Sequence, residues 1–317
     1  MTEAFSDLVD LASERLGASV IEANDEFFAP KERLILARAP VWREGRYTER
    51  GKWMDGWETR RRRDEGHDWC VVRFGAAGIV RGVDVETTHF KGNYPETCAI
   101  DVGDPPSPWQ EVLTVSPLVG DAHNRFAIEG APRATHLRLR IFPDGGVARL
   151  RVYGEVKPEW DVLRRRGQID LAAVENGGTV VASSDMFFGS RHNLIMPGEA
   201  RTMHEGWETK RRRGGGHDWT IVRLGAPGIV ERAEVDTRRF IGNAPGACSL
   251  EECVTVGASV PGSDAAWRDL LARIPLLPDR SHTFDVVRPA PRSVTHVRFN
   301  IFPDGGVARL RLFGRLA

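Results

Sequence analysis

The chain has 317 residues, with 44 basic and 44 acidic side chains and a formal net charge of zero. A neutral chain has no global attraction to nucleic acid or to an anionic membrane surface, so the composition argues against both partners. No apolar run is long enough to span a bilayer, and residues 1–28 lack the pattern of a secretory signal. The four cysteines, Cys70, Cys98, Cys248 and Cys253, show no metal-binding or disulfide spacing. We therefore expect reduced thiols and a cytoplasmic protein.

One long motif occurs twice in the chain. Residues 57–75 read WETRRRRDEGHDWCVVRFG, and residues 207–225 read WETKRRRGGGHDWTIVRLG, 150 residues later. Segments within residues 10–28 and 135–151 also recur, but at a spacing of 160. Similarity at such regular spacings indicates an internal duplication.

The change of spacing also locates insertions and boundaries. It predicts about ten extra residues around 41–45 in the first copy. It also predicts a compensating insertion of about ten residues around 257–267 in the second copy. A chain of this length exceeds what one hydrophobic core usually fills. We therefore predict a first repeat at 1–155, a linker at 156–166 and a second repeat at 167–317.

The expected secondary structure is mostly strand. In chain order, the predicted elements are a short helix at 7–16, strands at 83–87, 137–141, 148–153 and 235–237, and a helix at 265–273. The PDGG sequence at 143–146 is predicted to join its two flanking strands into a hairpin. Short alternating strands with frequent Gly and Pro turns favour an all-β fold of two tandem antiparallel β-sandwich or jelly-roll repeats.

Four motifs in fixed order carry a family resemblance. They are WETRRR at 57–62, GHDW at 66–69, ETTHFKGN at 86–93 and IFPDGG at 141–146, and closely similar motifs follow in the second half. With these motifs the chain resembles the allantoicase family, the allantoate amidinohydrolases of purine degradation, over nearly its whole length. The resemblance implies two jelly rolls similar to galactose-binding domains, a homo-oligomer, and hydrolysis of allantoate to ureidoglycolate and urea. It assigns no catalytic residues.

Site residues must therefore be inferred from the chemistry. Allantoate carries a carboxylate and two neutral ureido groups on one carbon, and release of intact urea breaks the bond from that carbon to a urea nitrogen. This step needs an acid for the departing nitrogen, a group that activates water, and a cation for the carboxylate. The catalytic candidates are His67 with Asp68, His89 and Glu58. For each the alternative is structural: a turn cap, a rim histidine or an ion-pair partner.

The substrate-binding candidates are Arg61, Arg63, Asn93 and Arg239, because a guanidinium meets a carboxylate in two parallel hydrogen bonds. The alternative for the arginine runs is a solvated or salt-bridged surface. The repeats also differ: His89 in the first corresponds to Arg239 in the second, and Glu26 to Met186. This difference predicts that the first repeat is the richer catalytic half.

A second class of function remains open at this stage. Duplicated β-sandwiches also serve as non-catalytic binding modules for small anionic or carbohydrate ligands, and fold alone does not separate module from enzyme. No cofactor is predicted, because no zinc-type spacing of His or Cys is present. The sequence leaves dependence on a divalent metal open.

Overall fold

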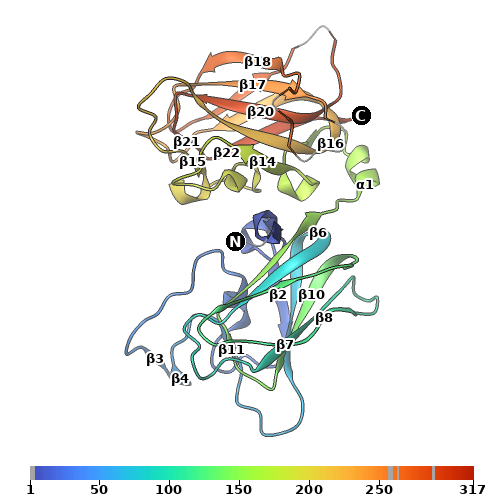
Figure 1. The fold of residues 1–317 in the computed structure, drawn as a ribbon, viewed down its shortest axis with the longest axis vertical. Coiled ribbons are helices and arrows are strands. Elements are labelled where there is room, and N and C mark those ends of the chain that lie inside the picture. Colours follow the sequence, from blue (N-terminus) through green and yellow to red (C-terminus); the bar gives the residue numbers. More distant parts are fainter. Residues whose placement is uncertain (1–3, 256–259, 263, 288–289) are drawn as a thin grey trace. The chain divides into compact units, whose positions relative to one another are not determined.

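The computed structural model describes residues 4–255, 260–262, 264–287 and 290–317. The chain divides into two compact units, Met1–Lys157 and Pro158–Ala317. Each is built almost wholly of antiparallel strands, as Figure 1 shows. The prediction of an all-β fold with two tandem β-sandwich repeats is confirmed. Within the described ranges, no helix has the length and apolarity needed to cross a membrane.

In its described residues, from 4 onward, the first unit contains twelve strands and three 3-10 turns. The strands are β1 (Val9–Asp10), β2 (Ser19–Ala23), β3 (Tyr47–Thr48), β4 (Gly51–Lys52), β5 (Trp57–Glu58), β6 (Asp68–Glu86), β7 (Thr97–Gly103), β8 (Gln110–Pro117), β9 (His123–Ala127), β10 (Arg133–Phe142), β11 (Gly146–Val147) and β12 (Arg149–Val156). The turns are η1 (Ala4–Asp7), η2 (Glu14–Leu16) and η3 (Lys31–Ile35).

The second unit repeats this series after one short helix, α1 (Trp160–Arg165). Its strands are β13 (Ile169–Asp170), β14 (Thr179–Ser183), β15 (Trp207–Glu208), β16 (Asp218–Asp236), β17 (Ala247–Cys253), β18 (Arg268–Pro275), β19 (Ser281–Asp285), β20 (Val294–Phe302), β21 (Gly306–Val307) and β22 (Arg309–Leu316). Its 3-10 turns are η4 (Val174–Asn176), η5 (Arg191–Ile195) and η6 (Met203–Glu205). Helix α1 lies within the segment that the sequence analysis assigned to a linker.

The long strand β6 organises the first repeat. Its first half pairs with β2 and β10, and its second half pairs with β12 and β9, so one strand runs through both layers of the sandwich. The pairing of β6 with β10 is interrupted between Arg73 and Gly78, and within this stretch a Cβ atom at Gly75 would come within 2.4 Å of the Leu16 carbonyl oxygen. In the second repeat β16 takes the same place, and the order β13-β22-β16-β20-β17-β18 matches β1-β12-β6-β10-β7-β8.

Three sequence-based predictions about elements are wrong. Residues 7–16 span the last residue of η1, strand β1 and turn η2, and no helix forms because Val9 and Asp10 pair with β12. The helix expected at 265–273 is largely strand β18, which pairs with β17. The predicted terminal hairpin does not form either, because β6 lies between β10 and β12. The turn between them leads instead into β11, which pairs with β5. Of the insertion expected at 257–267, residues 257–259 and 263 lie outside the described residues.

The pairing of β5 with β11 matters for the site. Trp57 is fully buried, and its indole Nε1 donates a hydrogen bond to the Asp25 carbonyl at 2.8 Å. Alternation along the strand turns Glu58 to the opposite side, and Glu58 pairs with Gly146 in register. The rigid indole thus fixes the two-residue strand that carries Glu58.

Candidate active site

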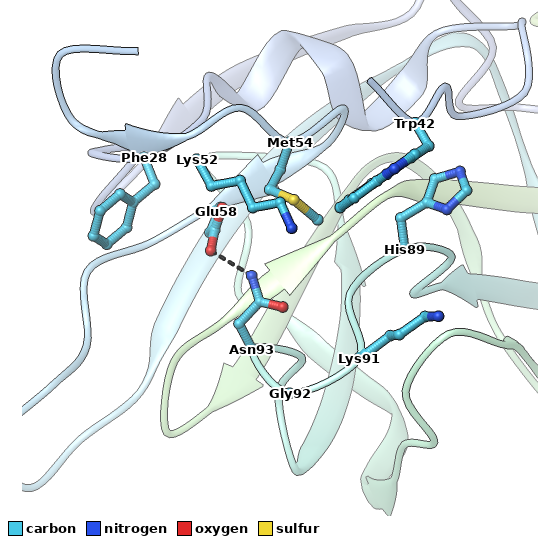
Figure 2. A pocket seen from close by; sticks show the side chains of 9 residues that line it. All are labelled: Phe28, Trp42, Lys52, Met54, Glu58, His89, Lys91, Gly92 and Asn93. Atoms are coloured by element: carbon cyan, nitrogen blue, oxygen red, sulfur yellow. Dashed lines mark hydrogen bonds between the residues drawn. The ribbon is translucent and has the colours of Figure 1, made fainter. Parts of the chain in front are cut away.

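A pocket of about 820 Å³ opens beside β5 in the first repeat. Its lining residues are Phe28, Trp42, Lys52, Met54, Glu58, His89, Lys91, Gly92 and Asn93, which Figure 2 shows as sticks. They come from the segment between β2 and β5, which includes β4, from β5 itself and from the turn after β6. The pocket thus combines apolar walls with one carboxyl group, one imidazole, one amide and two ammonium groups.

Glu58 is the buried acid of this pocket. Only 9% of the residue is exposed, and its Oε1 accepts a hydrogen bond of 2.6 Å from Asn93 Nδ2 (Figure 2). Burial raises the pKa of the Glu58 carboxyl, and the Asn93 hydrogen bond opposes that shift. A carboxyl group with a raised pKa can hold a proton at a higher pH than an exposed one, which suits a general acid.

His89 enters the pocket from a tight turn after β6. Its φ of 72° is left-handed, and its backbone N–H donates to Asp121 Oδ1 at 2.7 Å. A non-glycine residue adopts this conformation only when its surroundings hold it. The imidazole lies beside the Trp42 indole, with ring centroids 5.7 Å apart (Figure 2). The turn therefore presents His89 to the pocket in a fixed place.

Trp42 and Lys52 come from the segment that is ten residues longer in the first repeat. Strands β3 and β4 form a small hairpin there, and the Lys52 ammonium lies 4.2 Å from the Trp42 ring centroid. Arg50 at the same hairpin donates to the Phe27 carbonyl at 3.0 Å, which ties it to the body of the repeat. The longer segment thus builds one wall of the pocket and brings a cation to it.

The second repeat keeps the acid and the amide but not their surroundings. Asn243 Nδ2 donates to Glu208 Oε1 at 2.6 Å, the same distance as in the first repeat. Arg239 replaces His89 on an equivalent turn with φ of 77°, and its backbone N–H donates to Asp279. Ile241 stands at the position of Lys91, and the shorter loop has no counterpart of Trp42. Arg239 therefore belongs to the other unit and is not among the residues that line the first-repeat pocket.

His67 and Asp68 lie outside the pocket lining. Asp68 is buried, and its Oδ1 accepts hydrogen bonds from Arg62 at 2.6 Å and from Asn24 at 2.8 Å. The His67 ring packs on Phe142 with centroids 4.8 Å apart. Burial and neighbouring arginine charges lower the pKa of His67. Their role as an acid/base pair stays a prediction, although the geometry favours a structural one.

The arginine run of the first repeat points mostly to solvent. Arg61 and Arg63 are exposed and do not line the pocket. Arg62 is the member that turns inward, toward Asp68, while its backbone N–H donates to Asp144 at 2.8 Å. Substrate binding by Arg61 and Arg63 also stays a prediction.

The sequence analysis missed six pocket residues: Phe28, Trp42, Lys52, Met54, Lys91 and Gly92. The signal that could have found Lys91 was present, because Ile241 takes its place in the second copy. Trp42 and Lys52 lie in the longer loop, which the sequence distinguishes from the second copy only by its length. Residues unique to one copy of a duplication are candidates for function in that copy.

Metal ligands and reactive thiols are two other kinds of group that could carry chemistry. In the part of the chain that the structure describes, no three His, Cys, Asp or Glu side chains are grouped so as to hold a metal ion. All four cysteines are buried and free. Burial raises the pKa of Cys98 and Cys248 to about 12, which keeps these thiols protonated and unsuited to metal binding or nucleophilic attack.

Fold and site together define a tandem β-sandwich protein with an acid-bearing, lysine-lined pocket in one repeat, suited to a small anionic ligand. The family model for the allantoicase repeat matches residues 9–157 and 169–317. A probable allantoicase of Pseudomonas aeruginosa is 48% identical over 98% of this chain and 96% of the relative. A probable allantoicase of Photobacterium profundum is 46% identical over 98% and 97%. The crystal structure of allantoicase from Saccharomyces cerevisiae matches with a TM-score of 0.82 at 34% identity, covering 96% of this chain and 92% of that one. The chain belongs to the allantoicase family.

Proposed function

We propose that this chain hydrolyses allantoate to ureidoglycolate and urea, and that the first-repeat pocket is where it does so. Membership of the allantoicase family, with matches over nearly the full length, supports the reaction. The observation that supports the site is the buried Glu58 carboxyl, held by Asn93 and given a raised pKa beside Lys52 and Lys91.

The pocket offers a group for each chemical requirement of the reaction. Lys52 and Lys91 supply the positive charge that attracts the substrate carboxylate. Trp42, Met54 and Phe28 provide apolar walls that limit water around the reacting carbon. Asn93 occupies Glu58 Oε1, so Oε2 is the oxygen free to exchange a proton. His89 is placed to orient a ureido group or to assist proton transfer.

The proton transfers can be balanced with Glu58 alone. Protonated Glu58 donates to the departing urea nitrogen as the C–N bond breaks, while the lone pair of the other ureido nitrogen forms a C=N bond to the same carbon. Water then adds to that carbon and releases one proton, which the Glu58 carboxylate accepts. Allantoate and water become ureidoglycolate and urea, and the acid is restored.

A matched pair of variants tests this proposal. Purified protein is mixed with allantoate, and urea and ureidoglycolate are both assayed, with and without added divalent metal. We expect Glu58→Gln to lower kcat by ~10³-fold, within the range for loss of a general acid. Glu208→Gln removes the equivalent carboxylate of the second repeat and should stay within about twofold of wild type.

Three outcomes would contradict the proposal. Equal losses in Glu58→Gln and Glu208→Gln would mean that the first repeat is not special. If His67→Ala greatly lowered kcat while Glu58→Gln stayed fully active, the acid/base role would belong to the GHDW motif instead. No turnover by wild type under any metal condition would favour a non-catalytic binding module.

Three further features stay predictions. We propose a homo-oligomer on the family resemblance, which sedimentation analysis would test. We propose a cytoplasmic location, for which the four free, buried cysteines are the support. We propose that no cofactor is required, and dialysis against a chelator before the assay would test that directly.

A further inference from the structure

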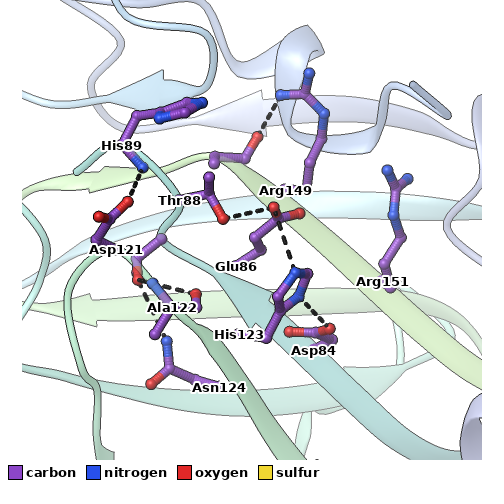
Figure 3. A network of polar contacts seen from close by, with 12 residues as sticks. Asp84, Glu86, Thr88, His89, Asp121, Ala122, His123, Asn124, Arg149 and Arg151 are labelled. Atoms are coloured by element: carbon purple, nitrogen blue, oxygen red, sulfur yellow. Dashed lines mark hydrogen bonds and ion pairs between the residues drawn. The ribbon is translucent and has the colours of Figure 1, made fainter. Parts of the chain in front are cut away.

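A second polar cluster of the first repeat lies next to the pocket turn. Asp84 and Glu86 stand two residues apart on β6, so they share one face, and His123 on β9 lies between them (Figure 3). His123 Nδ1 is 2.8 Å from Asp84 Oδ2, and His123 Nε2 is 3.7 Å from Glu86 Oε1. Both acidic residues are buried, with 2% and 7% of their surface exposed. The histidine therefore bridges two buried carboxylates.

This cluster is joined to His89 by one hydroxyl group. Thr88 Oγ1 donates a hydrogen bond of 2.7 Å to Glu86 Oε1 (Figure 3). Thr88 directly precedes His89, whose left-handed backbone is held on its other side by Asp121. The turn that presents His89 is thus fixed by a backbone N–H on one side and by the Thr88 hydroxyl on the other.

Arg125 of β9 donates from Nε to Asp84 Oδ2 at 3.2 Å, but the arginines of β12 opposite the two acids are engaged elsewhere. Arg149 and Arg151 pair in register with Glu86 and Asp84. Arg149 Nη2 bonds to Asp55 at 3.0 Å, and Arg151 Nη2 donates to the Leu36 carbonyl at 2.6 Å. Glu86 instead contacts Thr88 and His123. His123 and Thr88 are therefore the side chains that hold the Glu86 carboxylate in place.

In the second repeat a different side chain holds the carboxylate that corresponds to Glu86. Arg238 stands at the position of Thr88, and Ser281 pairs with Asp236 where His123 pairs with Glu86. The Arg238 guanidinium donates to both oxygens of Asp236, at 3.0 and 2.7 Å. In the second repeat one arginine therefore satisfies both oxygens of the carboxylate, and no histidine is needed. The turn that follows carries Arg239, so it has no imidazole to position.

We propose that Asp84, His123 and Glu86 form a positioning network that acts through Thr88 to set the His89 imidazole in the pocket. The inference rests on the proposed function, because it requires His89 to belong to the site. None of the four network residues lines the pocket, so they act on the reaction through His89. Misplacement of a reacting group by about 1 Å is enough to cost up to ~10²-fold in rate.

The sharpest test uses a matched pair at one position. Thr88→Val keeps the shape of the side chain but removes the donor, and Thr88→Ser keeps the donor. We expect Thr88→Val to lower kcat by about tenfold with little change in KM, because orientation and not uniform binding is lost. Thr88→Ser should stay within about twofold of wild type. His123→Ala should resemble Thr88→Val.

Arg238→Ala is the control in the second repeat. It removes the equivalent contact to Asp236, so we expect it to lower the melting temperature while kcat per folded molecule is unchanged. Equal kcat losses in Arg238→Ala and Thr88→Val would mean that the network only stabilises the fold. Unchanged kcat in both Thr88→Val and His123→Ala would also overturn the inference. If Thr88→Val does not fold, His123→Ala compared with Arg238→Ala decides alone.

A double-mutant cycle separates this inference from the proposed function. The Thr88→Val effect should vanish in a His89→Ala background, because there is no longer an imidazole to misplace. If His89→Ala is itself fully active, the role of His89 in the proposed function fails. If His89→Ala loses activity but Thr88→Val costs the same factor in both backgrounds, only the positioning network fails.

Discussion

The two repeats hold the same carboxyl–amide pair at the same distance, yet the residues around that pair differ. Glu58 with Asn93 and Glu208 with Asn243 each form a hydrogen bond of 2.6 Å on equivalent strands and turns. Around the first pair lie an imidazole, two lysines and an indole, whereas the second repeat has Arg239 and Ile241 at the matching turn. The shared scaffold places an acid, and the unshared residues decide what the acid can do.

The longer loop of the first repeat accounts for much of this difference. Its hairpin packs Gly51 against the Phe28 ring and places the Arg50 guanidinium over the Phe27 ring. In the second repeat the matching residues, Phe187 and Phe188, are 70% and 59% exposed. The longer loop of the first repeat thus contacts aromatic side chains whose counterparts are exposed in the second repeat, while the sheet order is the same in both.

The largest expected effect comes from replacing the residue that differs at the equivalent turn of each repeat, His89 in the first and Arg239 in the second. We expect His89→Ala to lower kcat by ~10²-fold, as loss of an orienting or proton-transferring group does. Arg239→Ala should cost much less. Steady-state kinetics of both variants measure the difference. Small, equal losses would show that neither position belongs to the site, and a raised KM with unchanged kcat in Arg239→Ala would show that Arg239 binds substrate.

The next prediction concerns a feature that the repeats share. Arg62 bonds to Asp68 and Arg212 bonds to Asp218, each at 2.6 Å, and both aspartates are buried. Because both arginines are partly exposed, we expect Asp68→Asn and Asp218→Asn each to lose ~2 kcal/mol of unfolding free energy, below the range for a fully buried pair. Chemical denaturation would measure it.

The same two variants decide the role of the GHDW motif. If Asp68 is structural, Asp68→Asn keeps its turnover per folded molecule, as Asp218→Asn does. A selective loss of kcat in Asp68→Asn, without a matching loss in Asp218→Asn, would restore His67 and Asp68 as the acid/base pair.

Particular residues show how far the sequence predicts the fold and the site. The duplication and the alternating strands could be predicted, because motif repetition and apolar–polar alternation are both visible in the sequence itself. The absence of a terminal hairpin could not, because the pairing of β10 and β12 with β6 depends on a strand more than fifty residues away. Glu58, His89 and Asn93 were predicted as separate candidates, and the structure brings them together. Lys52 and Trp42 were missed because no local pattern shows where an irregular loop folds.

A smaller effect is expected from the positive charge that Lys52 brings to the longer loop of the first repeat. Lys52 lies in the pocket wall, and its ammonium attracts the substrate carboxylate before and during the reaction. We expect Lys52→Met to raise KM by about tenfold with little change in kcat, because uniform binding is lost. The effect should shrink as ionic strength rises. Lys210→Met, at an exposed lysine of the second repeat, is the control and should leave KM unchanged.

The smallest expected effect is on stability, and it follows from the pKa of Glu58. Burial raises that pKa above its ordinary value of 4.5, so the folded state favours the protonated acid. Stability from this group is therefore complete below the unfolded pKa and is lost as pH rises through the folded pKa. Glutamine cannot ionise. We expect Glu58→Gln to match wild type below about pH 4.5 and to become the more stable protein as pH rises toward about 7.

Thermal denaturation at a series of pH values measures this effect, and Asn93→Ala refines it. The Asn93 amide lowers the pKa of Glu58 against the effect of burial, so its removal should raise that pKa further. The loss of stability in Asn93→Ala should then begin at the same pH as in wild type, continue to a higher pH and be larger in total. If wild type and Glu58→Gln instead lose stability in parallel across the series, Glu58 has the same pKa in the folded and unfolded states. The pocket would then have no buried acid ready to protonate a departing nitrogen.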